Sequence, residues 1–148
     1  MVNRAVDRLY VGKGDKDLYD KMVQESILKN TTRKEQFLLA MAYGIRSNVR
    51  RKIEQREEFF LRKDLLLEDE AMLDAIAIRA DNALDVLSSK VQIFSIAQEY
   101  AHAGIRLLAA EIEGTSYGSF EKKFEKELFE TYETIRGRAD SALEKGRS

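Results

Sequence analysis

The spacing of apolar residues predicts a chain that is mostly helical. Apolar residues at intervals of three and four predict a first amphipathic helix over about residues 16–27, with Asp15 as its N-cap. A capping-box pattern, in which Thr32 is followed three residues later by Glu35, predicts the start of a second helix that continues to about Val49. This second helix is apolar around most of its circumference, so we expect it to be largely buried.

Three more helices are predicted downstream. Apolar spacing predicts a third helix over about residues 71–80, and Ser89 with Gln92 forms a second capping-box pattern that opens a long central helix ending near Ile112. The residues expected to face inward from the central helix are Ile93, Ile96, Ala97, Tyr100, Gly104, Leu107 and Leu108. A final charged helix over residues 118–145 carries one apolar stripe, formed by Phe120, Phe124, Leu128, Tyr132 and Ile135.

Short strands are predicted at two places. The segment Arg8–Val11 is rich in strand formers and is followed by Gly12-Lys13-Gly14, whose spacing matches neither common phosphate-binding loop and which we interpret as a turn. Residues 47–63 lose helical periodicity and predict a loop, with Glu57–Leu61 extended. The fold class predicted from these patterns is all-α, with about five helices in a compact bundle and one or two short strands.

The length and apolar content indicate one domain. A chain of 148 residues with 44% hydrophobic residues has the size and composition of a single folded unit. We divide residues 1–148 into a strand-helix-helix segment (residues 1–50), core helices (residues 64–112) and the C-terminal amphipathic helix (residues 118–145).

Composition excludes several classes of function. The chain has no cysteine, which excludes disulfides, thiolate catalysis, zinc fingers and iron–sulfur sites. No run approaches the roughly 18 apolar residues of a membrane span, and the first 14 residues lack the apolar core of a signal peptide. We therefore expect a cytoplasmic protein that contacts no membrane.

The only histidine, His102, follows Glu99 in a Glu-x-x-His pair, half of the motif of di-iron helical bundles. The second half is missing. The histidine also shares one polar side of the predicted helix with Gln92, Ser95, Glu99, Arg106 and Glu113, which predicts that it lies at the surface. With no nucleophile-elbow serine either, we expect no catalytic residue, metal or cofactor. A di-iron enzyme is kept as the third hypothesis.

Charge is distributed unevenly along the chain. Residues 29–63 hold ten basic and four acidic groups, net +6, whereas residues 64–148 hold ten and seventeen, net −7. Basic residues also crowd the start of the second predicted helix, where the helix dipole disfavours them but free backbone N–H groups attract phosphate. The candidate nucleic-acid-binding residues are Arg8, Lys29, Thr31, Thr32, Arg33, Lys34, Arg50, Arg51 and Lys52. The alternative is a solvated basic face offset by Glu54, Glu57 and Glu58.

The order of strand, helix, turn and threonine-capped helix over residues 1–50 is that of a ribbon-helix-helix module. In such a module the strand pairs with the strand of a second copy. A lone strand at residues 8–11 therefore predicts a homodimer or larger assembly.

Three blocks of the sequence resemble a known family. The blocks are Phe37–Gly44, Asp69–Ile78 and Ile96–Ile105, together with the opening Asp7–Val11 and Leu18-Tyr19. They are similar to the small accessory proteins associated with Dnd-type DNA phosphorothioation systems, over about residues 6–110. The resemblance implies a role in sulfur modification of DNA or in the restriction that depends on it, with modification or restriction proteins as partners.

The leading hypothesis is therefore a non-enzymatic accessory subunit that contacts DNA through its basic middle. The alternative is a helical subunit that contacts only protein partners.

Overall fold

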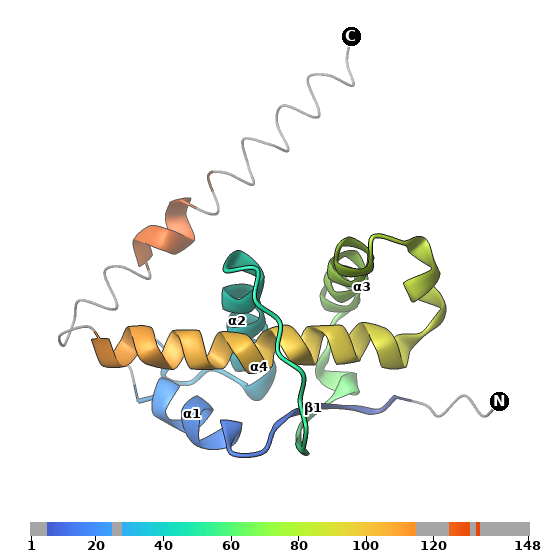
Figure 1. Ribbon diagram of the computed structural model, residues 1–148. Helices are drawn as coiled ribbons and strands as arrows, with labels where there is room; N and C mark the ends of the chain where they lie inside the picture. The colour runs from blue at the N-terminus through green and yellow to red at the C-terminus, as the bar shows by residue number, and fades with distance from the viewer. Residues whose placement is uncertain (1–5, 25–27, 115–124, 131–132, 134–148) are drawn as a thin grey trace, which may run out of the picture. The chain divides into compact units, whose positions relative to one another are not determined.

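The computed structural model describes residues 6–24, 28–114, 125–130 and 133. The chain divides into two units, Met1–Ala110 and Glu111–Ser148, which are described separately. The elements in chain order are β1 (Arg8–Gly12), α1 (Asp15–Met22), α2 (Arg33–Arg46), β2 (Arg56–Leu61), η2 (Arg62–Asp64), α3 (Leu67–Asp81), η3 (Leu84–Ser88) and α4 (Lys90–Gly114). The prediction of a mostly helical chain with short strands is confirmed (Figure 1). No helix in this part of the chain is both long and apolar enough to cross a membrane.

The first two helices begin where local signals place them, with one correction. Thr32 and Glu35 form the predicted capping box: the Thr32 hydroxyl accepts the Glu35 N–H at 3.2 Å and the Glu35 carboxylate accepts the Thr32 N–H at 3.0 Å. Asp15, however, is not the N-cap of α1. Gly14 takes that place with a φ of 91°, a conformation that glycine adopts without strain, and Asp15 is the first helical residue. The second helix ends at Arg46, earlier than predicted.

The long helix α4 confirms half of its predicted cap. The Gln92 N–H donates to the Ser89 hydroxyl at 3.2 Å, but the Gln92 side chain donates to Asp81. Of the residues predicted to face inward, Tyr100 is only half-buried and Leu107 is exposed. The helix has a wider buried surface than predicted, because Phe94, Gln98, Ala101, His102, Ala103 and Ile105 are buried as well.

The predicted C-terminal helix lies largely outside the described residues. Within residues 118–145, the structure describes a helical stretch at 125–130, where Leu128 is exposed. The other four members of the predicted apolar stripe, Phe120, Phe124, Tyr132 and Ile135, are not among the described residues.

The two strands pair with each other. β1 and β2 are antiparallel, with Leu9 opposite Phe60 and Val11 opposite Glu57, and a bulge interrupts the register between Leu9 and Tyr10. The expectation that β1 lacks a partner in its own chain is therefore wrong. The partner strand β2 lies in the segment after α2 and begins 48 positions after the start of β1. The sequence predicts an extended stretch there but no pairing. β1 therefore does not need a strand from a second copy as its partner.

Helices α2 and α4 cross in close contact. A Cβ atom on Gly104 would overlap the backbone carbonyl of Ala40, and a Cβ atom on Gly44 would overlap the carbonyl of Tyr100. Both glycines are buried. The two backbones approach so closely at this crossing that each helix needs a residue without a side chain there.

The core of the first unit forms around this crossing. Phe37 on α2 meets Phe60 on β2 with ring centroids 5.4 Å apart, and Tyr19 on α1 meets Phe59 at 4.5 Å. Other buried apolar residues are Leu9, Val11, Met22, Leu28, Met41, Leu73, Ala77, Val86, Ile93, Phe94, Ile105 and Leu108. The sheet, α1, α2, α3 and α4 thus share one apolar interior.

Substitution Gly104→Ala tests the α2/α4 crossing. The added methyl group would overlap the Ala40 carbonyl, so we expect a loss of about 2 kcal/mol or more in the free energy of unfolding, measured by denaturant titration. The matched control is Gly114→Ala, where nothing lies within 4 Å of the added Cβ and alanine favours the helix. Equal stability of the two variants would contradict the tight crossing.

Candidate functional site

A cluster of three polar side chains, of which Asp15 and His102 are buried and Arg106 is partly exposed, joins α1 to α4. The Asp15 carboxylate is 1% exposed, and its Oδ2 atom lies 2.5 Å from Nδ1 of His102. Arg106, one turn further along α4, donates from Nη1 to the His102 carbonyl at 3.0 Å. The same Nη1 lies 3.0 Å from Asp15 Oδ1, without the geometry of a hydrogen bond, so charge alone links this pair. A buried carboxylate is thus held between an imidazole and a guanidinium group.

The prediction that His102 lies at the surface is wrong, since its side chain is only 9% exposed. The polar side of α4 is covered at this point by β1 and α1. Gly12 makes room for the ring: a Cβ atom there would come within 2.6 Å of His102 Nδ1 and 2.9 Å of Asp15 Oδ2. A residue with a side chain at position 12 would therefore collide with the His102 ring. The periodicity of the helix could not predict that β1 and α1 cover His102.

The hydrogen bonds of His102 determine which ring nitrogen is open. An ionised Asp15 carboxylate accepts hydrogen bonds only, so the short contact requires a proton on Nδ1. The 3.0 Å contact between Arg106 Nη1 and Nδ1 is then not a hydrogen bond, because Nδ1 has no free lone pair. Nε2 has no hydrogen-bond partner among the described residues and is not fully enclosed.

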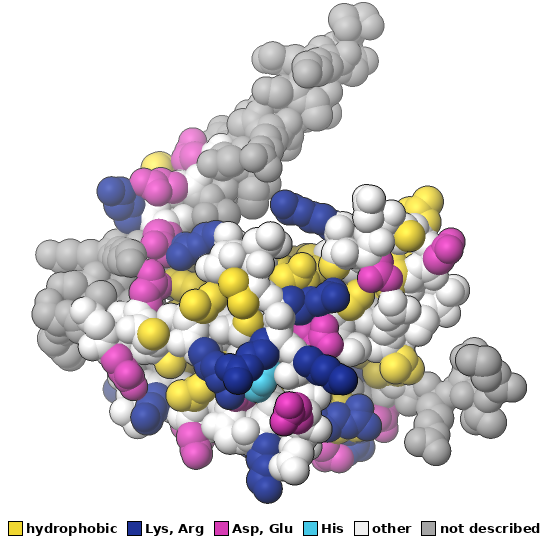
Figure 2. All heavy atoms as spheres, viewed as in Figure 1, with side chains coloured by type: hydrophobic (Ala, Val, Ile, Leu, Met, Phe, Trp, Pro, Cys, Tyr) yellow, Lys and Arg dark blue, Asp and Glu magenta, His cyan; other side chains and the backbone are white. Residues whose placement is uncertain are grey.

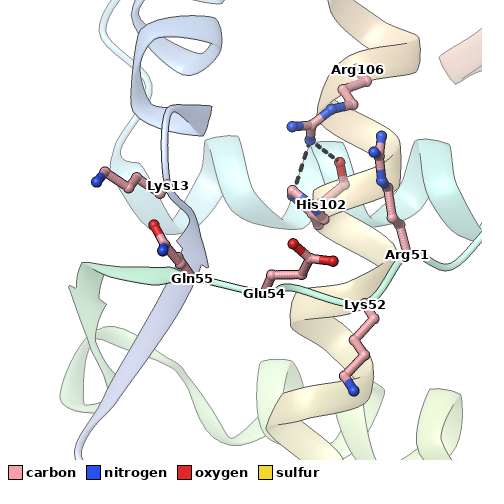
Figure 3. A pocket seen from close by; sticks show the side chains of 7 residues that line it. All are labelled: Lys13, Arg51, Lys52, Glu54, Gln55, His102 and Arg106. Atoms are coloured by element: carbon pink, nitrogen blue, oxygen red, sulfur yellow. Dashed lines mark hydrogen bonds between the residues drawn. The ribbon is translucent and has the colours of Figure 1, made fainter.

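His102 and Arg106 lie at the inner wall of a pocket of about 350 Å³. The other residues that line it are Lys13, Arg51, Lys52, Glu54 and Gln55. Figure 2 shows Lys and Arg side chains gathered around the histidine. In Figure 3 the guanidinium groups of Arg51 and Arg106 lie beside His102, whereas Lys13 and Lys52 extend outward at two edges of the pocket. The pocket is therefore predominantly basic.

Backbone hydrogen bonds hold the pocket-forming loop in place. The segment between α2 and β2 crosses α4 (Figure 1), where the Arg51 N–H donates to the Glu99 carbonyl at 3.1 Å. At its far end the Lys13 N–H donates to the Gln55 carbonyl at 2.8 Å. These two bonds hold Arg51 and Lys13 on opposite sides of His102, although the three residues are far apart in sequence.

A second pocket, of about 280 Å³, adjoins the loop. Lys52 and Glu54 line both pockets, and Ser95 and Gln98 on α4 belong to the second. Arg56, which also lines it, lies over the Tyr10 ring at 4.1 Å from its centroid. Glu99 lines the second pocket too, so the surface along α4 on this side of the loop carries charges of both signs.

The cations at the start of α2 have acidic partners. Arg33 pairs with Asp20 at 2.9 Å and lies over the Phe59 ring, and Lys34 pairs with Asp69 at 3.1 Å. Their positive charge at a helix N-terminus is therefore neutralised within the fold.

The neighbouring threonines also have local roles. The Thr32 hydroxyl belongs to the capping box, and Thr31 donates to the Leu28 carbonyl at 2.7 Å. The amide of Gln36 also donates to the Thr31 carbonyl, at 2.9 Å. The structure brings Thr31 and Thr32 together with Arg33 and Lys34, but away from the pocket.

The other predicted nucleic-acid-binding residues are ion-paired, exposed without an ion pair, or part of the pocket lining. Arg8 pairs with Glu58 and Asp7, which raises the pKa of its guanidinium, and Arg50 pairs with Glu99 at 3.1 Å. Lys29 is exposed and has no ion pair within the described residues. Only Arg51 and Lys52 line the pocket.

Sequence reasoning missed four pocket residues, namely Lys13, Gln55, His102 and Arg106, and gave Glu54 only the role of offsetting charge. Gly12-Lys13-Gly14 does form a turn, as predicted. The pairing of Glu99 with Arg50 also separates it from His102, whose carboxylate partner is Asp15. Among the described residues, no group of three or more histidine and acidic side chains is arranged to hold a metal ion.

No protein-family model matches the chain, and neither a curated protein nor a solved structure shows significant similarity to it.

Substitution Lys34→Gln tests whether this cation is structural. Burial would raise the pKa of Asp69, but the hydrogen bond from the Leu66 N–H and the charge of Lys34 outweigh it and hold the pKa below its ordinary value of 3.8. A carboxyl with a lowered pKa stabilises the fold above its unfolded-state pKa and loses that effect as pH falls through the folded value.

We therefore expect Lys34→Gln to lower the unfolding free energy by about 1 kcal/mol at pH 7, and the deficit to shrink below about pH 4. Denaturant titrations at several pH values measure this. A variant as stable as the parent at pH 7 would mean that the ion pair contributes nothing.

Proposed function

We propose that the protein is a non-enzymatic accessory subunit that holds the phosphate backbone of DNA at its basic pocket, in a DNA phosphorothioation or restriction system. One observation carries the proposal. Lys13, Arg51 and Lys52 line one pocket, and none has an ion-pair partner among the described residues. Cations that line one concave surface without ion-pair partners are a pattern expected of a phosphate-binding site.

The length of the polar surface along α4 supports a strand rather than a single ion. From Ser95 to Arg106, the α4 residues that line the two pockets span about 16 Å at 1.5 Å per residue. Phosphates along one strand of duplex DNA rise by about 3.4 Å each along the axis while they wind around it, so a surface of this length can meet more than one of them. Arg56, stacked on Tyr10, adds a cation at the far end.

The pocket lining supports binding rather than covalent catalysis. The buried Asp15 and His102 form a pair like those that orient a catalytic base. Yet the residues lining this pocket include no serine, threonine, tyrosine or cysteine that the histidine would activate. The resemblance of residues 6–110 to accessory proteins of DNA phosphorothioation systems supports the proposal that the protein acts in DNA sulfur modification.

A second candidate function is a protein-interaction subunit. Several large apolar side chains are exposed on α3, η3 and the start of α4: Leu67 is 87% exposed, Leu84 70% and Val91 60%. Such residues suit contact with a partner protein. This function and DNA binding use different residues, so the two are separable by experiment.

The double substitution Arg51→Gln/Lys52→Gln tests the DNA proposal. We expect weaker binding to duplex DNA of any sequence, and a slope of log affinity against log salt that is shallower by about two units. Fluorescence anisotropy over a salt series measures both. Arg79→Gln, which removes an exposed cation on α3 that has no partner among the described residues, is the matched control.

Arg33→Gln/Lys34→Gln should leave DNA affinity close to that of the parent protein, because those cations already have acidic partners. If the parent protein does not retain duplex DNA at about 50 mM salt, DNA binding is refuted and the protein-interaction function takes its place.

A further inference from the structure

His102 forms part of the inner wall of the pocket, and binding of the DNA phosphate backbone does not require a histidine there. We infer that the pocket binds a phosphomonoester, a phosphate group with a single ester bond, and that Nε2 of His102 contacts its free oxygens. This inference rests on the proposed function in that both use the same basic pocket. It adds the chemical class of the ligand and a role for the buried cluster.

The charge of the pocket matches a dianion. The charged groups that face it or contact its wall are four cations and two carboxylates: Lys13, Arg51, Lys52, Arg106, Glu54 and Asp15. Their sum is +2 with a neutral histidine and +3 with the protonated histidine that donates to a phosphate oxygen. A phosphomonoester carries about −1.5 to −2 at pH 7, whereas a backbone phosphodiester carries one negative charge. A monoester therefore offsets more of the positive charge of the pocket than a single backbone phosphate does.

The depth of the wall also favours a monoester. His102 is 9% exposed and Asp15 1%, so a ligand reaches Nε2 only by entering the pocket. A backbone phosphodiester has two esterified oxygens and chain on both sides, which keeps it at the rim with Arg51 and Lys52. A phosphomonoester has three free oxygens and can enter with those oxygens first. A pocket of about 350 Å³ is within the usual range for small ligands.

The hydrogen bonds around His102 prepare it for an anion. Asp15 holds the proton on Nδ1, which fixes the ring and leaves Nε2 for the ligand. When Nε2 is protonated as well, its N–H donates to a phosphate oxygen while Asp15 stabilises the imidazolium charge. Arg106 uses Nη1 within the cluster, and its Nη2 has no partner among the described residues. The ring and this guanidinium thus offer two neighbouring donors to one phosphate.

The first test compares two duplexes of identical sequence that differ only in a 5′-phosphate or a 5′-hydroxyl end. We expect the phosphorylated duplex to bind about tenfold more tightly, the effect of one charge-assisted hydrogen bond. His102→Asn keeps a donor near the Nδ1 position for Asp15 but removes Nε2. It should abolish the preference, so that the two duplexes bind with equal affinity.

The second test needs no substitution. Because the chain has a single histidine, the ring nitrogens of protein labelled with ¹⁵N-histidine give one unambiguous pair of NMR signals. Addition of a deoxynucleoside 5′-monophosphate should shift the Nε2 signal more than the Nδ1 signal, and the corresponding nucleoside should shift neither.

The two probes distinguish the sources of the monoester. A preference for the phosphorylated duplex without nucleotide binding identifies a nucleic-acid end, and nucleotide binding without that preference identifies a free nucleotide. If the duplexes bind equally and the nucleotide leaves Nε2 unshifted, the inference is overturned while backbone binding stands. If the nucleotide binds but neither duplex does, the proposed DNA function fails and the phosphomonoester site stands.

Discussion

The close crossing of α2 and α4 is the contact on which the rest of the first unit depends. Gly44 and Gly104 let the two backbones meet, and this fixes where the chain emerges after α2. From there the segment before β2 crosses α4, bonding to the Glu99 carbonyl on the way. The sheet is then completed against β1, and β1 covers His102. The pocket is thus a product of helix packing rather than of a local motif.

Ion pairs explain why a basic sequence does not imply a basic surface throughout. The positive charges at the start of α2 meet Asp20 from α1 and Asp69 from α3, so they tie three helices together. Arg51 and Lys52, in the loop after α2, have no such partners among the described residues. The cations of the basic segment, residues 29–63, are thereby divided into a structural set and a set that remains available to a ligand.

Local signals in the sequence predicted the helices well, because caps depend on residues three apart. Thr32 with Glu35, and Ser89 with Gln92, identified two helix starts directly. The pairing of β1 with β2 and the burial of His102 depend on residues far apart in the chain; Asp15 and His102 are separated by 87 positions. Periodicity within α4 could show that His102 shares a side with other polar residues, but not that another segment covers that side.

The tie between the sheet and α4 also restricts how the protein can associate. In a two-stranded sheet each strand has an outer edge, which normally offers N–H and C=O groups to a further strand. Here the Tyr10 N–H on β1 donates to the Gln98 side chain of α4 at 3.0 Å. A strand from another molecule would have to displace that amide before it could add to the sheet at this point. By occupying the Tyr10 N–H, Gln98 thus opposes edge-to-edge aggregation at this point of β1.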